Sequence, residues 1–146
     1  MNKFILIFLF IFCFAKSQLY RGSELRTLEP VLYGKFEVRY KPAQGDGLVS
    51  SFFVYNDDFP NTDWVEVDIE VLGRYPNIVD MNVITNTSHL RTHFTTMNTH
   101  LDFQVYGFEW TPDYVAWFIN GEEVYRQTDD HIGDLVPPAK FMMNIC

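Results

Sequence analysis

One stretch of nine residues constrains the fold of this chain more than any other, because acidic and aliphatic residues alternate along it. It reads Trp64-Val65-Glu66-Val67-Asp68-Ile69-Glu70-Val71-Leu72. Successive side chains of a β-strand point to opposite faces, so Glu66, Asp68 and Glu70 share one face, and the other face carries Val65, Val67, Ile69 and Val71. Trp64 and Leu72 belong to the acidic face. The pattern predicts a strand that covers a hydrophobic core with one face and presents carboxylates on the other.

Three explanations fit an acidic strand face. A solvated face is common, but like charges on one face destabilise a sheet. A calcium site would draw oxygen ligands from a loop rather than from a straight strand. The third explanation is catalysis: side chains that lean along the strand can bring the carboxyl groups of Glu66 and Glu70 to about 5–6 Å, the separation of the pair in a retaining glycosidase. Spacing alone leaves all three open.

A family resemblance favours catalysis. Glu66-Val67-Asp68-Ile69-Glu70, followed by Val71-Leu72-Gly73, resembles the active-site strand of glycoside hydrolase family 16 in its compact Glu-x-Asp-x-Glu form, which is typical of lichenases and xyloglucan transglycosylases. Further segments resemble lichenase segments in the same order, at residues 33–39, 47–53, 108–112, 117–121 and 142–144. The resemblance implies that Glu66 is the nucleophile, that Glu70 is the general acid/base, and that Asp68 lies between them and tunes their protonation.

The rest of the chain predicts an all-β fold. Short runs of alternating apolar residues are separated by turn residues, and no stretch keeps a helical period. Asn120-Gly121 predicts a hairpin with a type I′ turn. The family resemblance makes the fold an antiparallel, concanavalin-like jelly-roll β-sandwich. Strands are expected near residues 33–40, 48–55, 64–72, 78–85, 90–95, 103–110, 113–120, 122–128 and 139–145.

Aromatic and polar residues suggest how a sugar chain would bind. Flat aromatic side chains offer contact area to the apolar face of a sugar ring. Trp64 lies on the acidic face, and Phe53 and Tyr55 share one face of the preceding strand. The resemblance adds substrate contacts at Glu24, Arg26, Asn82 and Asn144. Lichenases have Tyr where this chain has Ile84, so one contact is missing, and Trp110 and Trp117 are expected to be packing residues.

The N-terminus predicts export. Residues 1–17 have the pattern of a secretory signal peptide, with Lys3 before an apolar run and small residues at the cleavage position. Cleavage would remove Lys3, Lys16 and Cys13, leaving nine basic residues against nineteen acidic ones, a net charge of −10. Such a charge argues against nucleic acid and anionic membranes as partners. With Cys146 as the single remaining thiol, no intrachain disulfide is expected.

Residues 18–146 are expected to form a partial family 16 catalytic domain. Family members have further strands before the segment that starts near Gly22 and after Cys146, so the predicted sandwich is incomplete. No metal ligand or cofactor is assigned: the family commonly carries a structural calcium, but its ligands come largely from segments outside this sequence, and the histidines have no metal-ligand spacing that connects them to the acidic strand. Asn86-Thr87-Ser88 is an N-glycosylation sequon.

These features together predict a secreted, monomeric enzyme that cleaves β-glucan, with mixed-linkage β-1,3-1,4-glucan as the substrate that the lichenase resemblance implies. Two other enzymes remain open on the same scaffold, a β-1,3-glucanase and a xyloglucan-type transglycosylase. A third alternative is a carbohydrate-binding homologue with weak catalysis.

Overall fold

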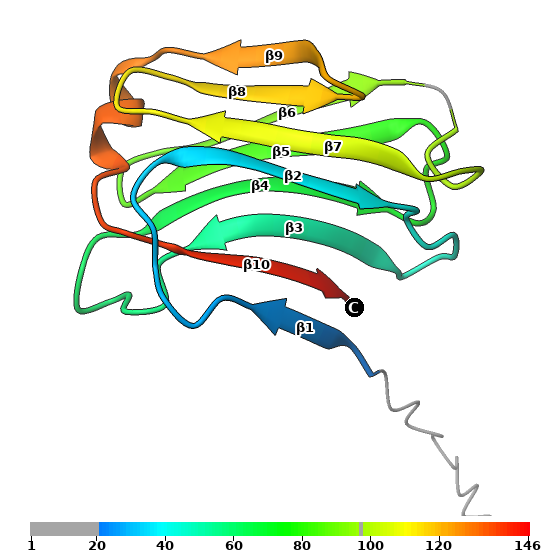
Figure 1. Cartoon of the computed structure of the whole chain (residues 1–146), viewed down its shortest axis with the longest axis horizontal. Coiled ribbons are helices and arrows are strands. Elements are labelled where there is room, and N and C mark those ends of the chain that lie inside the picture. Colours follow the sequence, from blue (N-terminus) through cyan, green and yellow to red (C-terminus); the bar gives the residue numbers. More distant parts are fainter. Residues whose placement is uncertain (1–20, 97) are drawn as a thin grey trace, which may run out of the picture.

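The computed structural model describes residues 21–96 and 98–146, which form two antiparallel β-sheets (Figure 1). The six-stranded sheet has the order β1-β10-β3-β4-β5-β6, and the four-stranded sheet has the order β2-β7-β8-β9. The elements are β1 (Ser23–Arg26), β2 (Gly34–Tyr40), β3 (Val49–Tyr55), β4 (Val65–Leu72), β5 (Ile78–Thr85), β6 (His89–Thr95), β7 (Gln104–Trp110), β8 (Val115–Ile119), β9 (Glu122–Gln127), a 3₁₀ helix η1 (Asp130–Asp134) and β10 (Lys140–Ile145). The signal peptide predicted at residues 1–17 lies outside the described residues.

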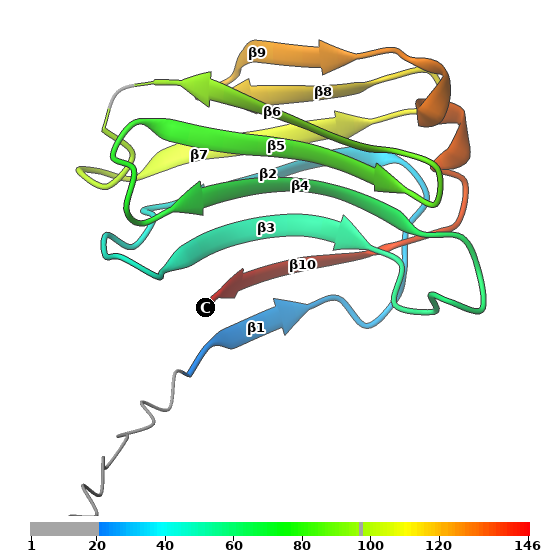
Figure 2. The ribbon, with the colours of Figure 1, turned by 180° about the vertical axis from the view of Figure 1, so that it is seen from behind.

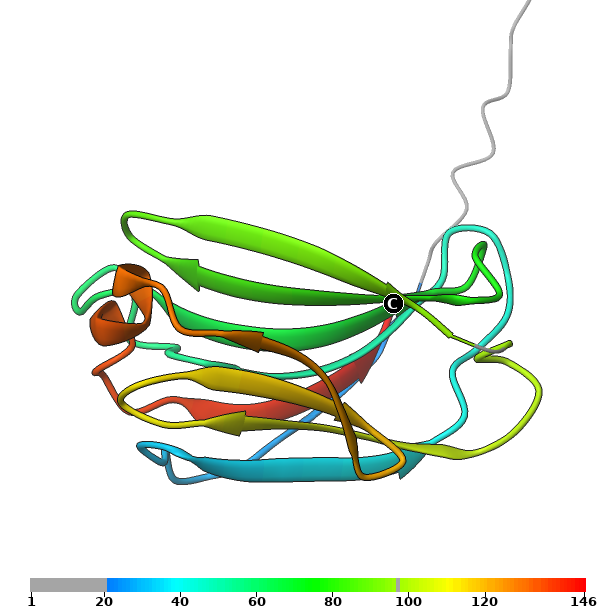
Figure 3. The ribbon, with the colours of Figure 1, turned by 90° about the horizontal axis from the view of Figure 1, so that it is seen from above.

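The two sheets stack as the layers of a jelly-roll β-sandwich, which confirms the predicted fold class. Figure 2 looks onto the outer face of the six-stranded sheet, and Figure 3 shows the two layers from above. Strands from distant parts of the sequence lie side by side, because β10 inserts between β1 and β3, and β7 pairs with β2. In the part of the chain that the structure describes, no helix has the length and apolar character needed to cross a bilayer.

The nine predicted strands correspond to β2–β10, with ends that differ by at most two residues. The predicted type I′ hairpin joins β8 to β9, and its central residues Asn120 and Gly121 have φ values of 53° and 84°, as this turn requires. The sequence pattern does not predict β1. This strand is only four residues long, all exposed, so it has no hydrophobic face to detect and depends on its pairing with β10.

The hydrophobic core fills the space between the sheets. Aromatic side chains from both layers meet there: the rings of Phe52 and Phe108 stack with their centroids 5.6 Å apart. Trp110 and Trp117 are fully buried, which confirms their predicted packing role. The indole N–H of Trp117 also donates to the backbone carbonyl of Asp68 over 3.0 Å. The four-stranded sheet thus packs against the inner face of β4, and the outer face of β4 stays uncovered by that sheet.

Candidate active site

The three acidic residues of β4 lie on the outer face of the six-stranded sheet. The alternating residues Val65, Val67, Ile69 and Val71 belong to the core between the sheets and are at most 1% exposed. Asp68 is itself 4% exposed, while Glu66 and Glu70 are half-buried. The predicted division of this strand into an aliphatic face and an acidic face is therefore confirmed.

The strand register gives each carboxylate its neighbours, because directly opposite residues share a face of the sheet. The opposite residues on β3 and β5 are Tyr55 and Ile84 for Glu66, Phe53 and Asn82 for Asp68, and Ser51 and Asp80 for Glu70. The next strands extend these three rows with His89, Arg91 and His93 on β6, Lys140, Met142 and Asn144 on β10, and Glu24 and Arg26 on β1.

The structure brings all seven residues predicted to bind substrate to this outer face. The register places six of them there: Glu24, Arg26, Phe53, Tyr55, Asn82 and Asn144. The seventh, Trp64, precedes β4 and donates its indole N–H to Glu66 Oε2 over 2.9 Å.

Hydrogen-bond donors surround the carboxylates. The amide nitrogen of Asn82 donates to Asp68 Oδ1 over 2.7 Å and to Glu70 Oε2 over 3.3 Å. Arg91 Nη2 lies 3.1 Å from the same Glu70 oxygen. Each of the three acidic side chains is thus held by at least one donor from a neighbouring side chain.

Burial and mutual repulsion change the acidity of this cluster. Burial raises the pKa of Asp68 well above its usual range, and the negative charges of Glu70 and Glu66 raise it further, against the opposing effects of the Asn82 hydrogen bond and the Arg91 charge. Burial also raises the pKa of Glu66, while the Trp64 hydrogen bond lowers it. Asp68 therefore keeps a proton to higher pH than an exposed aspartic acid does, and in its protonated form it does not repel the glutamates on either side.

Aromatic rings gather at the Glu66 end of the face. The ring of Trp64 lies 4.9 Å from that of Phe59 and 6.4 Å, at a right angle, from that of Tyr55. A hollow of about 500 Å³ opens between Phe59 and Trp64 on one side and residues 84–89 on the other. The Trp64 backbone N–H donates to Asn86 Oδ1 over 3.1 Å, so the turn that carries the sequon also supports the aromatic end.

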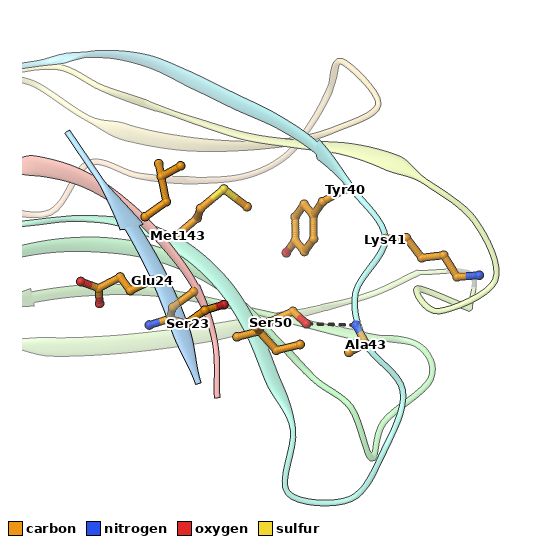
Figure 4. A pocket seen from close by; sticks show the side chains of 10 residues that line it. Ser23, Glu24, Tyr40, Lys41, Ala43, Ser50 and Met143 are labelled. Carbon is orange, nitrogen blue, oxygen red and sulfur yellow. Dashed lines mark hydrogen bonds between the residues drawn. The ribbon is translucent and has the colours of Figure 1, made fainter. Parts of the chain in front are cut away.

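The side of the face formed by β1 and β10 is polar and charged. Arg26 pairs with Glu24 and lies 3.5 Å from Asp57, which also accepts a hydrogen bond from Lys140 over 2.8 Å. At the other end of these strands a hollow of about 360 Å³ lies between β1, β10 and the end of β2 (Figure 4). Tyr40, Ser50 and Met143 contribute to its walls together with Glu24 and Asn144 of the outer face, whereas none of the three β4 carboxylates does.

Comparison with known proteins identifies the family. The family model for glycosyl hydrolases family 16 matches residues 11–145. This chain belongs to that family. The membership implied by the acidic strand and by the flanking segments is therefore confirmed.

The chain is similar to glucanases and to a transglycosylase. A beta-glucanase from Fibrobacter succinogenes is 39% identical over 134 residues, covering 86% of this chain and 38% of the relative. The crystal structure of a prokaryotic beta-1,3-1,4-glucanase (lichenase) from a mouse hindgut metagenome is 42% identical with a TM-score of 0.76, covering 84% of this chain and 56% of that one. The structure of Crh5 transglycosylase in complex with NAG is 30% identical with a TM-score of 0.75, covering 85% and 53%. The chain thus spans about half, or less, of the length of these relatives.

Sequence reasoning missed several residues that the family 16 fold brings to the outer face. The most closely involved is Arg91, which contacts Glu70 and Asn82. Arg91 is two residues from both His89 and His93, so the alternation of side chains along a strand could have predicted that all three share one face. The strand register was not available from the sequence, so its partners could not be named. Ser51, which donates to Asn144 Oδ1 over 2.6 Å, was missed for the same reason.

Within the described residues, no group of three or more histidine, cysteine, aspartate or glutamate side chains is arranged to hold a metal ion. Cys146 is a free, exposed thiol. His89 and His93 are exposed on the outer face, whereas His100 is buried between the carbonyl oxygens of Pro42 and Tyr75.

Proposed function

We propose that this chain is an endo-acting β-glucanase that cleaves mixed-linkage β-1,3-1,4-glucan with retention of configuration. The observation that carries the proposal is the placement of Glu66 and Glu70 on either side of the buried Asp68, on an open face with Trp64 and Tyr55 beside them. The similarity to a lichenase structure at 42% identity supports the choice of substrate.

In the proposed first step, Glu66 is the nucleophile. Trp64 holds Glu66 Oε2, which leaves Oε1 free to attack the anomeric carbon. Glu70 donates its proton to the glycosidic oxygen as the bond to that oxygen breaks, and a covalent glycosyl-enzyme forms on Glu66. The leaving glucan chain departs as a neutral alcohol.

In the second step Glu70, now ionised, accepts a proton from water. The water oxygen bonds to the anomeric carbon and the carboxylate of Glu66 is released. Each displacement inverts the anomeric carbon, so the product retains the original configuration. Asp68, whose pKa burial raises, lies between the two glutamates and tunes their protonation.

The proposed substrate contacts come from residues on the outer face of the six-stranded sheet, beside the three carboxylates. Trp64, Tyr55 and Phe53 offer apolar surface to sugar rings. Hydrogen bonds to hydroxyl groups are proposed for four polar residues, Glu24, Arg26, Asn82 and Asn144. Ile84 replaces a tyrosine of lichenases and offers apolar contact only.

The direct test is hydrolysis of barley β-glucan by the purified chain, followed by viscosity and by ¹H NMR of the first product formed. We expect a rapid fall in viscosity and a β-anomer that mutarotates later to the equilibrium mixture. Equal or greater activity on laminarin would replace the lichenase assignment with a β-1,3-glucanase. Binding of β-glucan without any cleavage would support a carbohydrate-binding homologue instead.

A transglycosylase is the second candidate, because the chain resembles Crh5 transglycosylase at 30% identity. In that reaction a sugar hydroxyl replaces water in the second step. A fluorescent oligosaccharide acceptor added to the β-glucan reaction distinguishes the two: label incorporated into long chains indicates transfer, whereas unlabelled short products indicate hydrolysis.

We also propose that the protein is a secreted monomer, with residues 1–17 as its signal peptide and residues 18–146 as its domain. A polymeric substrate outside the cell is consistent with export. N-terminal sequencing of the protein recovered from an expression host's medium, together with its elution volume in size-exclusion chromatography, tests both statements. A retained N-terminus or a dimeric mass would contradict them.

A further inference from the structure

Arg91 on β6 reaches across the outer face to Glu70. Its Nη2 lies 3.1 Å from Glu70 Oε2 and 3.8 Å from Asp80 Oδ2. The Arg91 side chain is 52% exposed and that of Glu70 is 30% exposed, so the contact lies at the rim of the site and not deep within it. Asp80, only 7% exposed, provides a fixed anchor for the guanidinium beside Glu70.

Arg91 also determines how the amide of Asn82 is oriented. Its Nε–H donates to Asn82 Oδ1 over 3.1 Å, so the amide nitrogen must point the other way, toward Asp68 Oδ1 and Glu70 Oε2. The flipped amide would set its NH₂ group against the Arg91 donor and its oxygen against two carboxylates. The flipped orientation would lose three hydrogen bonds. Asn82 is only 2% exposed, so its donors would be buried against a donor and its acceptor against acceptors.

The contacts require an arginine. A guanidinium presents donors in a rigid planar fork, so one side chain can serve Asn82 through Nε and Glu70 through Nη2 at the same time. An ammonium group is a point charge on a flexible stem and can satisfy one of these partners well. His93, whose Nδ1 lies 3.6 Å from Asp80 Oδ1, approaches the same anchor.

We infer that Arg91 is a positioning residue for Glu70, acting directly on its carboxylate and indirectly by orienting Asn82. The inference rests on the proposed function, in which Glu70 is the general acid/base. Its consequence is specific: loss of Arg91 impairs the step in which Glu70 protonates the leaving oxygen, and it affects substrate binding little.

The test compares Arg91→Gln and Arg91→Lys with the matched control Arg74→Gln. Arg74 has the same 52% exposure and a 3.1 Å contact with Asp46, but lies in the turn after β4. On barley β-glucan we expect Arg91→Gln to lower kcat about 10- to 100-fold with KM within about twofold. Arg91→Lys should recover part of the loss, and Arg74→Gln should stay within about twofold of the wild type.

An aryl β-glycoside with an activated phenol distinguishes a loss of Glu70 positioning from a general disruption of the active site. Its leaving group needs little protonation, so first-turnover phenol release by Arg91→Gln should fall less than about threefold. Equal losses on both substrates, or a change confined to KM, would overturn the positioning role.

A readout independent of activity completes the test. The side-chain NH₂ signals of Asn82 in a ¹⁵N–¹H NMR spectrum, assigned by their loss in Asn82→Asp, should shift in Arg91→Gln and not in Arg74→Gln. If the wild type cleaves none of these substrates, the proposed function fails, yet the amide signals still decide whether Arg91 orients Asn82. Unchanged Asn82 signals in Arg91→Gln would overturn the inference.

Discussion

The inner face of β4 carries four aliphatic side chains at most 1% exposed, whereas its outer face carries three carboxylates, one of them almost as buried as the core. The aliphatic residues need only a complementary apolar surface, which the four-stranded sheet supplies. The carboxylates need particular donors: Trp64 for Glu66, Asn82 for Asp68, and Asn82 and Arg91 for Glu70.

The two faces of β4 contribute differently to the free energy of folding. Apolar burial on the inner face stabilises the fold in proportion to the area removed from water. Three acidic groups together on the outer face oppose folding through desolvation and repulsion. A sheet gains no stability from this arrangement, which supports the proposed catalytic role of the carboxylates.

Glu66→Gln should produce the largest effect and confine it to activity. Without its nucleophile the chain should lose at least about 10⁴-fold in kcat on β-glucan, while its thermal midpoint stays the same or rises. Glu37→Gln, at an exposed glutamate of β2, is the control and should leave kcat unchanged. A large fall in the thermal midpoint of Glu66→Gln would mean that the outer face also supports the fold.

Ile69→Ala should produce the opposite pattern. This side chain is 1% exposed in the core, and its truncation should lower the free energy of unfolding by about 2–5 kcal/mol, measured by urea denaturation. The matched variant Ile84→Ala removes the same atoms from a half-buried position on the outer face and should cost about 1 kcal/mol or less. Equal losses at the two positions would remove the distinction between the faces.

Asp68→Asn should stabilise the chain in a pH-dependent way. Because burial raises the pKa of Asp68 in the folded state, the folded chain binds its proton more tightly than the unfolded chain does. Stability then falls as pH rises from the unfolded pKa, about 3.9, through the raised folded pKa. Asparagine removes this loss, so the variant should gain over the wild type as urea denaturation is repeated from pH 4 to pH 7. If the difference in unfolding free energy between Asp68→Asn and the wild type were constant from pH 4 to pH 7, the raised pKa of Asp68 would be contradicted.

Tyr106→Phe should produce the smallest effect. Burial raises the pKa of Tyr106 to about 12, and its hydroxyl has no hydrogen-bond partner among the described residues. Removing an unpaired buried hydroxyl should raise the free energy of unfolding by up to about 1 kcal/mol. Tyr114→Phe is the contrast, because the Tyr114 hydroxyl donates to Glu109 over 2.7 Å and its loss should lower stability. The same sign for both variants would show that hydrogen bonding does not decide the outcome.

The faces of β4 could be predicted because side-chain alternation is a local property of the backbone. Val67 and Asp68 are adjacent in sequence, and their opposite placement needs no knowledge of any other strand. The position of Arg91 beside Glu70 depends on how β6 aligns with β5 and β5 with β4, which no local pattern reveals.

Two other features depended on more than local pattern. The resemblance to family 16 supplied Glu24 and Arg26, and the structure places them on a strand that the sequence does not predict. β1 has no hydrophobic alternation of its own, and it is a strand because β10 offers it a partner. The raised pKa of Asp68 likewise depends on its burial in the folded sheet, which spacing alone could not show.

The most direct measurement is azide rescue of Glu66→Ala and Glu70→Ala with an activated aryl β-glycoside, because it reads the role of each carboxylate from the configuration of the product. Glu70→Ala should still form the glycosyl-enzyme, and azide should then attack that intermediate to give the β-glycosyl azide. Glu66→Ala has no nucleophile, so azide should attack the substrate itself and give the α-glycosyl azide. If Glu70→Ala gives the α-azide and Glu66→Ala the β-azide, the roles of the two glutamates are reversed; if neither variant differs from the wild type in rate or product, the acidic face is not the catalytic site.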